Sequence, residues 1–409
     1  MDNLTESSRR VVADLRELAN LTSDENGAQR VAWSPTWQKA RDWFSEKAIE
    51  AGATIEIDAA GNSWAKITGE SEESVVIGSH IDSVTNGGWL DGALGVVAGL
   101  EILRIYDKTK PAKTIYVVTF ADEEGVVYGS SVMGSSAATG NFDVNNIINR
   151  LSKDGVSAKD LLANYHVDVE NINDAKAQLE ARKMIAFLEL HIEQGPVLEE
   201  MNKQVACVYG VQGIERHMIE FTGQPAHAGS FPTLMRKDAF LAAAEATLAF
   251  REVALKYDGV CTVGKVSVEP DVPTIFPGKC NISLDQRSIN KDLLKAMYEE
   301  AQNITNEMAK KHQVEVKWDE IYSIDPTLFD ENLVKLCQEA IIEETGEETT
   351  MFSGPLHDAV EMARIAPTIM MFVMSKGGLS HNKDEDTPDV AIEIATRAFI
   401  RLVDKVVNK

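Results

Sequence analysis

The chain has 409 residues, 44% of them hydrophobic and 25% charged, a composition typical of a globular protein too long for one ordinary core. Its 64 acidic residues outnumber its 40 basic ones, and the resulting net charge of −24 repels phosphate backbones, which argues against nucleic-acid binding. No apolar run reaches the roughly 18 residues of a membrane span, and the first residues lack the pattern of a secretory signal, so we expect a cytoplasmic protein without a membrane partner.

The first part of the chain alternates predicted helices with apolar strands. Amphipathic helices are predicted at 6–19 and 36–52, the second directly after Ser34 and Pro35. Buried strands are predicted in SVVIGS, TIYVVTF and MIAFLEL, and a fourth, PTIMMFVM, lies near the end of the chain. Helical segments separate these strands, which predicts parallel β-α-β units in an α/β domain. Polar, titratable residues follow each strand, and open α/β sheets bind their ligands at that edge.

The middle of the chain has a different pattern. Residues 211–326 alternate strand-like segments with two predicted helices, at 236–256 and 290–312. This pattern predicts an inserted α+β domain with its helices on one face of an antiparallel sheet. We therefore expect a discontinuous α/β domain, 1–210 and 327–409, with a mixed, mostly parallel sheet.

Side chains of the kinds that bind metal ions stand at or after the ends of the four strands: His80, Asp91, Glu124, His191 and His381. Histidine nitrogen and carboxylate oxygen are ligands of zinc and similar divalent ions. Each residue alone has an ordinary explanation, since Asp91 could cap the following helix and Glu124 could lie in a solvated acidic turn. Five ligands exceed the three protein ligands usual for one catalytic zinc, and a carboxylate that bridges two ions resolves this count. Asp82, two residues after His80, is predicted to orient the imidazole of His80.

The ordered motifs of the chain resemble those of one enzyme family. GSHIDS, NGGWLDG, DEEG, LELHIEQGPVLE, AHAGSFP, LDQRS and GGLSH resemble the amidases of the hydantoinase/carbamoylase family, over residues 10–400. That family includes N-carbamoyl-L-amino acid hydrolases, β-ureidopropionases and allantoate amidohydrolases. The resemblance implies a zinc-exopeptidase-like catalytic domain, an inserted lid and dimerisation domain at 211–326, and a homodimer formed through that lid.

The resemblance also implies the composition of the metal centre. Asp91 bridges two divalent ions, zinc in the first place, with manganese, nickel or cobalt as alternatives. His80 and His191 complete one site, and Glu124 and His381 complete the other.

The same resemblance assigns roles to other residues of the catalytic domain. Glu123 is implied as the general base, which takes a proton from the attacking water and returns it to the leaving nitrogen. Gln194 is implied to hold the ureido group of the substrate, and His357 to be an accessory substrate-site residue.

Three residues of the predicted lid are implied to reach the substrate. His227 donates to the oxyanion, in the active site of the partner subunit, and Thr274 stands where the family has an asparagine. Arg287 pairs with the carboxylate of the substrate, for which a bidentate guanidinium is suited. A protein of net charge −24 needs such a local cation to bind an anionic substrate.

The sequence therefore predicts a metal-dependent amidohydrolase of linear C–N bonds, acting on a small amide with a carboxylate, foremost an N-carbamoyl-L-amino acid. Allantoate or ureidopropionate hydrolysis, an aminoacylase or dipeptidase activity, and an inactive scaffold that uses the lid for protein interaction remain as alternatives. The chain departs from the family pattern near the pocket, at Trp89, Leu90, Val127, Thr274 and Leu356. These departures leave the exact substrate, its stereochemistry and the native metal open.

Overall fold

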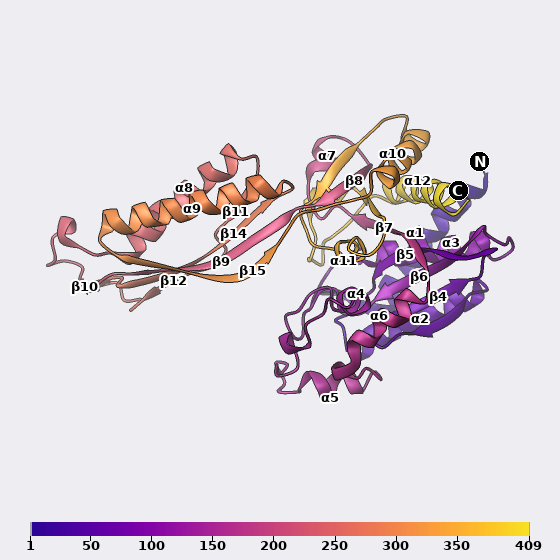
Figure 1. The fold of residues 1–409 in the computed structure, drawn as a ribbon, viewed down its shortest axis with the longest axis horizontal. Coiled ribbons are helices and arrows are strands. Elements are labelled where there is room, and N and C mark those ends of the chain that lie inside the picture. Colours follow the sequence, from indigo (N-terminus) through magenta and orange to yellow (C-terminus); the bar gives the residue numbers. More distant parts are fainter. Residues whose placement is uncertain (1, 409) are drawn as a thin grey trace. The chain divides into compact units, whose positions relative to one another are not determined.

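A computed structural model describes residues 2–408 (Figure 1). The chain divides into two compact units. Unit 1 comprises the residues up to Tyr209 and from Phe329 onward, and unit 2 is the segment Gly210–Leu328. Among the described residues, no helix is long and apolar enough to cross a membrane.

The centre of unit 1 is a mixed sheet with the strand order β8-β18-β7-β5-β6-β4-β3, in which β17 also pairs with β8. The short strand β16 pairs with the last two residues of β8, which like β16 belong to unit 2. The four strands from β18 to β6 are parallel to one another, and β8, β4 and β3 pair antiparallel beside them. The mixed sheet predicted from the sequence is confirmed, but it is not mostly parallel, because only the four apolar runs recognised there pair in parallel. The strands are β3 (Thr54–Ile57), β4 (Ser63–Ile67), β5 (Ser71–His80), β6 (Lys113–Phe120), β7 (Met184–Ile192), β8 (Val205–Val211), β16 (Thr327–Leu328), β17 (Thr350–Ser353) and β18 (Thr368–Val373).

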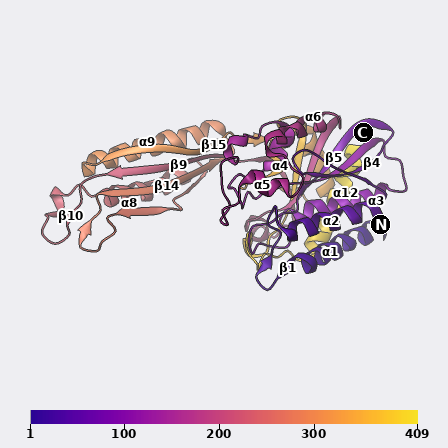
Figure 2. The same ribbon diagram turned by 90° about the horizontal axis from the view of Figure 1, so that it is seen from below.

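Helices cover both faces of this sheet (Figure 2). On one face, α3 packs on β5 and β6, α12 packs on β7 and β18, and α1, α2 and α10 complete the layer. On the other face, α11 and α4 pack on the central strands, and α6 packs on α4. Ser34 caps α2 by accepting a hydrogen bond from the main-chain N–H of Trp37, which confirms the predicted start of this helix. The helices are α1 (Asp2–Thr22), α2 (Pro35–Glu50), α3 (Ala93–Tyr106), α4 (Met133–Thr139), α5 (Ala158–Ala163), α6 (Ala175–Glu180), α7 (Val197–Glu200), α10 (Glu331–Thr345), α11 (Asp358–Met362) and α12 (Asp389–Val407).

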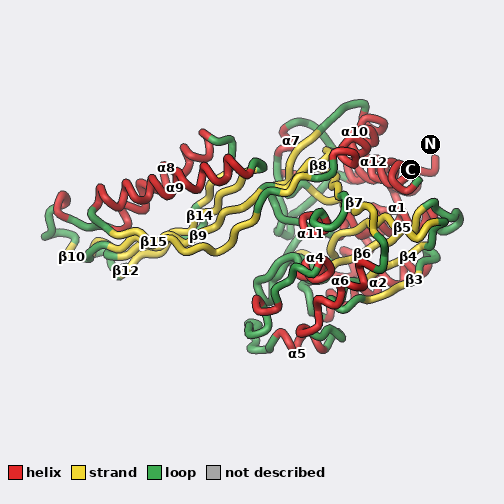
Figure 3. Tube along the Cα trace, viewed as in Figure 1, coloured by secondary structure: helices red, strands yellow, loops and turns green. Residues whose placement is uncertain are grey.

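Unit 2 is an antiparallel sheet with two long helices on one face (Figure 3). Along β14, buried and partly exposed residues alternate, because successive side chains of a strand point to opposite faces. The buried face, which includes Phe221 and Leu284, packs against the apolar side of α8, and the α+β fold predicted for this segment is confirmed. The elements are β9 (Gly213–Thr222), β10 (Ala226–His227), α8 (Ala239–Lys256), β11 (Val260–Thr262), β12 (Val266–Glu269), β13 (Ile275–Phe276), β14 (Lys279–Ser288), α9 (Lys291–His312) and β15 (Glu315–Ile324).

Candidate metal centre

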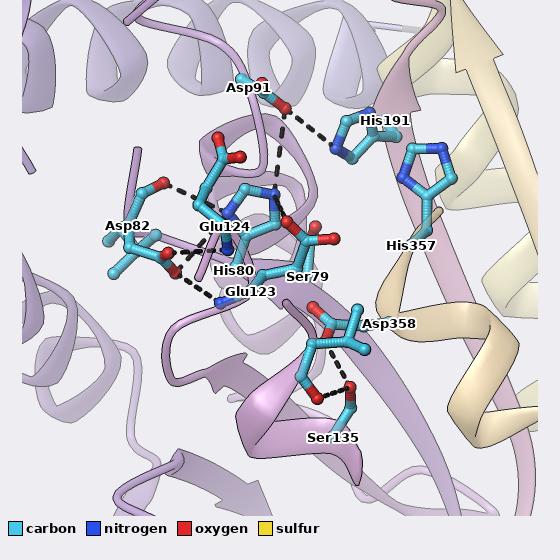
Figure 4. Close-up of polar contacts among 12 residues, drawn as sticks. Ser79, His80, Asp82, Asp91, Glu123, Glu124, Ser135, His191, His357 and Asp358 are labelled. Atoms are coloured by element: carbon cyan, nitrogen blue, oxygen red, sulfur yellow. Dashed lines mark hydrogen bonds and ion pairs between the residues drawn. The ribbon is translucent and has the colours of Figure 1, made fainter. Parts of the chain in front are cut away.

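Three buried side chains from separate elements of unit 1 converge on one point (Figure 4). His80 is the last residue of β5, His191 is the next to last residue of β7, and Asp91 lies in the loop before α3. The Nε2 atoms of His80 and His191 lie 3.8 and 3.2 Å from Oδ1 of Asp91. These three residues offer ligand atoms close enough together to hold one metal ion.

A second group of ligand atoms shares Asp91. The Nε2 atom of His381 lies 3.3 Å from Oδ2 of Asp91 and 3.4 Å from Oε2 of Glu124. Glu124 follows β6, and its other carboxylate oxygen is buried without a hydrogen-bond partner. The two groups use different oxygens of Asp91, which is the geometry of a carboxylate that bridges two ions.

The protonation of the histidines in the first group fits a metal ion. Nδ1 of His80 lies 3.1 Å from the main-chain oxygen of Asp82, and Nδ1 of His191 lies 2.8 Å from that of Ile192. Because a carbonyl oxygen only accepts hydrogen bonds, Nδ1 carries a proton in both rings, and in a neutral imidazole Nε2 turns its lone pair toward Asp91. Nε2 of His191 and Oδ1 of Asp91 are buried and make no hydrogen bond. With a neutral His191 these two acceptors would repel each other, and either a proton on Nε2 or a bound cation removes the repulsion.

The pKa values of the side chains in the two groups also indicate that positive charge would stabilise this site. Burial lowers the pKa of His80 to about 3, so this imidazole is neutral and ready to bind an ion. Burial, together with the charge of the Asp91 carboxylate, raises the pKa of Glu124 to about 9. For His191, burial alone would lower the pKa, but the nearby Asp91 carboxylate raises it to about 9. Without a metal ion, a proton on His191 supplies the positive charge that Asp91 requires.

Glu123 lies beside the first group without belonging to it. Its Oε2 is 3.7 Å from Nε2 of His80, and burial raises the pKa of its carboxyl well above the ordinary value, with Glu124 adding to the effect. The main-chain N–H groups of Glu123 and Glu124 donate to the carboxylate of Asp82, at 3.3 and 3.1 Å. The Asp82 carboxylate therefore holds the turn that carries both acids, and its Oδ1 also lies 3.7 Å from Nδ1 of His80, which donates its hydrogen bond to the main-chain oxygen of Asp82.

Asp91 does not cap the helix that follows it, although this was an open interpretation of the sequence. The N-cap of α3 is Gly92, with φ 64° and no side-chain cap hydrogen bond. A Cβ atom on Gly92 would overlap the imidazole of His80. This glycine is required both for the left-handed backbone and for the close approach of the ring.

The other two predicted residues of unit 1 lie next to these groups. Nε2 of Gln194 donates to Oδ2 of Asp91 at 3.0 Å, and its amide oxygen is buried without a partner. The ring of His357 is 4.5 Å from that of His191, and its Nε2 lies 2.9 Å from the hydroxyl of Ser353. Gln194 thus has an unused acceptor beside the candidate metal centre, while His357 is enclosed at 2% exposure.

Sequence reasoning missed three buried residues around this site. Glu385 accepts hydrogen bonds from the main chain of the loop that carries Asp91, although NKDEDT has the composition of a solvated loop. Arg30 is completely buried and donates to the main-chain oxygen of Ile81 beside the acidic residues. Trp33 donates to Asp122, the residue before Glu123, at 2.8 Å. No local pattern marks these contacts, because each joins segments far apart in the chain.

Unit 2 places two predicted residues together. Nδ1 of His227 accepts hydrogen bonds from the main-chain N–H groups of Gly229 and Ser230, at 3.0 and 3.1 Å. The proton of this exposed imidazole is therefore on Nε2, which makes Nε2 a hydrogen-bond donor. The main-chain oxygen of Thr274 accepts from Ala228, so Thr274 supports the same turn.

Arg287 lies on the partly exposed face of β14. Its Nε donates to Oδ1 of Asp285 at 2.8 Å, and Nε of Arg216 donates to Oδ2 of the same carboxylate at 2.7 Å. Two guanidinium groups thus share one carboxylate, and the cluster carries one net positive charge. It is a local cation of the kind that an anionic ligand of this acidic protein requires.

Comparison with known proteins places the chain among hydrolases. The sequence model of "Peptidase family M20/M25/M40" matches residues 76–405. The chain is 30% identical to the allantoate amidohydrolase of Bacillus subtilis, over 94% of this chain and 93% of that protein. It is 29% identical to the N-carbamoyl-L-amino-acid amidohydrolase of Paenarthrobacter aurescens, over 97% of both. The crystal structure of a hydantoinase/carbamoylase family amidase from Burkholderia multivorans matches with a TM-score of 0.87 and 29% identity, over 98% of both chains.

Proposed function

Because the chain belongs to peptidase family M20/M25/M40 and to its hydantoinase/carbamoylase amidases, we propose that it hydrolyses the carbamoyl C–N bond of N-carbamoyl-L-amino acids. The chain is a hydrolase of carbon–nitrogen bonds in linear amides. The observation that carries the proposal is the pair of ligand groups that share Asp91, whose buried Oδ1 has no hydrogen-bond partner.

The residues of the centre fit two divalent ions, with zinc proposed first. His80 and His191 would hold one ion, Glu124 and His381 the other, and Asp91 both. Bound divalent ions lower the pKa of water and polarise a carbonyl oxygen.

Glu123 is proposed as the general base. Its carboxylate takes a proton from the attacking water and delivers it to the leaving nitrogen, from a position beside His80. Its raised pKa in the metal-free protein is consistent with a group that holds a proton between these two steps.

The substrate contacts are proposed from the donors and acceptors at the positions described above. The unused amide oxygen of Gln194 accepts from the ureido nitrogen of the substrate. The Nε2–H of His227 donates to the developing oxyanion, in the partner subunit's active site. Arg287 binds the carboxylate with Asp285 holding its guanidinium in place, and Thr274 and His357 are secondary contacts.

Allantoate is the competing substrate, because an allantoate amidohydrolase is as similar to the chain as the carbamoyl-amino-acid enzyme. Both compounds carry a ureido group and a carboxylate, and both would use the same donors. The difference lies in the groups around them, where the chain departs from the family pattern.

A substrate panel tests the proposal. The protein is stripped with a chelator, reloaded separately with zinc, manganese, nickel or cobalt, and assayed for ammonia from N-carbamoyl-L-amino acids, their D-enantiomers and allantoate, and for amine from N-acetyl amino acids. We expect metal-dependent turnover that is fastest on an N-carbamoyl-L-amino acid. His191→Ala should abolish it, while His312→Ala, a histidine of α9 outside the site, should not. Turnover of acyl-amino acids alone would reject the substrate, and no metal-dependent turnover on any of them would favour the scaffold.

We also propose a homodimer that associates through unit 2. Leu241, Leu248 and Leu255 lie seven residues apart on α8 and are 42%, 74% and 64% exposed. Residues at this spacing form one stripe along a helix, and a second copy of the same helix can cover it. A cytoplasmic location is part of the proposal, and the four free cysteines agree with a reducing compartment.

A further inference from the structure

The buried carboxylate of Glu385 joins the two loops that carry Asp91 and His381. Its Oε1 accepts hydrogen bonds from the main-chain N–H groups of Leu90 and Asp91, both at 3.1 Å. Its Oε2 accepts a hydrogen bond of 2.9 Å from the hydroxyl of Ser380, the residue before His381. Glu385 is only 2% exposed, so these bonds do not compete with bulk water.

The motif NGGWLDG makes room for this carboxylate. A Cβ atom on Gly88 would overlap the carboxylate of Glu385, so only glycine permits the approach. The glycine at position 88 therefore provides space beside the loop that ends in Asp91.

The network continues to the proposed bridging ligand. The hydroxyl of Ser380 lies 3.3 Å from Oδ2 of Asp91, and Nε2 of Gln194 lies 3.0 Å from the same oxygen. Glu385 therefore holds the main chain of Asp91 and, through Ser380, contacts its carboxylate. Both oxygens of Glu385 already accept hydrogen bonds, so it is not counted among the metal ligands.

We propose that Glu385 is a positioning residue of the metal centre, which holds Asp91 and His381 in register so that the two side chains can share one ion. The inference rests on the proposed function, because it presupposes bound divalent ions. The Glu385 carboxylate accepts two main-chain hydrogen bonds from one loop and a hydroxyl hydrogen bond from the other. These bonds keep both ligands in place before the ion arrives. Such outer contacts commonly change metal affinity about ten- to hundredfold.

Three variants separate positioning from general stability. Glu385→Ala removes all the acceptors and leaves two main-chain N–H groups without partners. Glu385→Gln keeps an oxygen for both N–H groups and offers an amide to Ser380, so it should preserve the register. Glu101→Ala is the matched control, because Glu101 is a buried carboxylate of α3 that pairs with Arg10 and Arg104 and touches no ligand.

The experiment titrates each metal-free protein with Zn²⁺ or Mn²⁺ against a chelating indicator and follows the metal-induced rise in melting temperature. We expect Glu385→Ala to bind about ten- to hundredfold more weakly and to lose first the ion shared by Asp91 and His381. Glu385→Gln and Glu101→Ala should bind with the affinity of the unaltered protein. Unchanged affinity in Glu385→Ala, or an equal loss in Glu101→Ala, would overturn the positioning role while the proposed function stands. An unaltered chain that binds no divalent ion would overturn both.

Discussion

In the protein without bound metal, the free energy of unfolding should fall as the pH rises from about 7 to about 9. Burial raises the pKa of Glu124 to about 9 and that of Asp82 to about 8. A carboxyl whose pKa is higher in the folded protein than in the unfolded chain holds an extra proton when folded. The stabilisation is complete below the unfolded pKa and is lost as the pH rises through the folded pKa. His191 acts in the same direction, because Asp91 raises its pKa to about 9 although burial opposes this.

The size of the effect follows from the number of protons. Each extra proton held by the folded state changes the free energy of unfolding by about 1.4 kcal/mol per pH unit. Glu124, with a side chain 6% exposed, should alone account for a loss of about 2 kcal/mol between about pH 7 and about pH 9, where half of its proton has dissociated. Bound divalent ions neutralise the same carboxylates, so the metal-loaded protein should show a much flatter dependence.

The assay is urea denaturation at several pH values, with chelator and with metal. Glu124→Gln has no titrating proton at this position, so in the chelated protein its loss of stability between about pH 7 and about pH 9 should be smaller by about 2 kcal/mol. A free energy of unfolding that rises with pH in the chelated protein would refute the reasoning. So would a Glu124→Gln variant with an unaltered slope.

Three further predictions concern the base, the glycine motif and the dimer. Glu123→Gln should lower kcat about a hundred- to ten-thousandfold while metal content stays unchanged, and a variant that keeps its turnover would remove Glu123 as the base. Gly88→Ala should displace Glu385 and weaken metal binding about tenfold or more in the same titration, whereas normal affinity would show that the space is not needed. Leu248→Glu should convert a dimer to a monomer in analytical ultracentrifugation. Leu234→Glu, at a 96% exposed position outside the stripe on α8, should leave the dimer intact. A Leu248→Glu variant that remains a dimer would contradict the proposed interface.

Most of the prediction for unit 1 was based on one pattern, an apolar run that is followed by titratable residues. Strands β5, β6, β7 and β18 are the parallel strands of the sheet, and their carboxyl ends or the loops after them supply His80, Glu124, His191 and His381. This was predictable because parallel strands bring their ends to one edge, so that local patterns far apart in the chain identify a common site.

The residues of unit 2 were predictable only in part. The strand-like segments and the two predicted helices identified its α+β fold, but the roles of His227, Thr274 and Arg287 came from the family resemblance. No spacing rule indicated that Asp285 would hold both Arg287 and Arg216, because that contact crosses from β14 to β9.

The sequence by itself determined the fold class and the candidate ligands, because strand periodicity and residue chemistry are local properties. Only the tertiary structure decided how the ligands are supported. In the structure, the Asp82 carboxylate accepts a hydrogen bond from the turn of Glu123, and Asp91 does not cap α3. Glu385 is buried between the loops of Asp91 and His381. A hydrogen bond between distant segments depends on where the whole chain places its donors and acceptors, which no window of the sequence records.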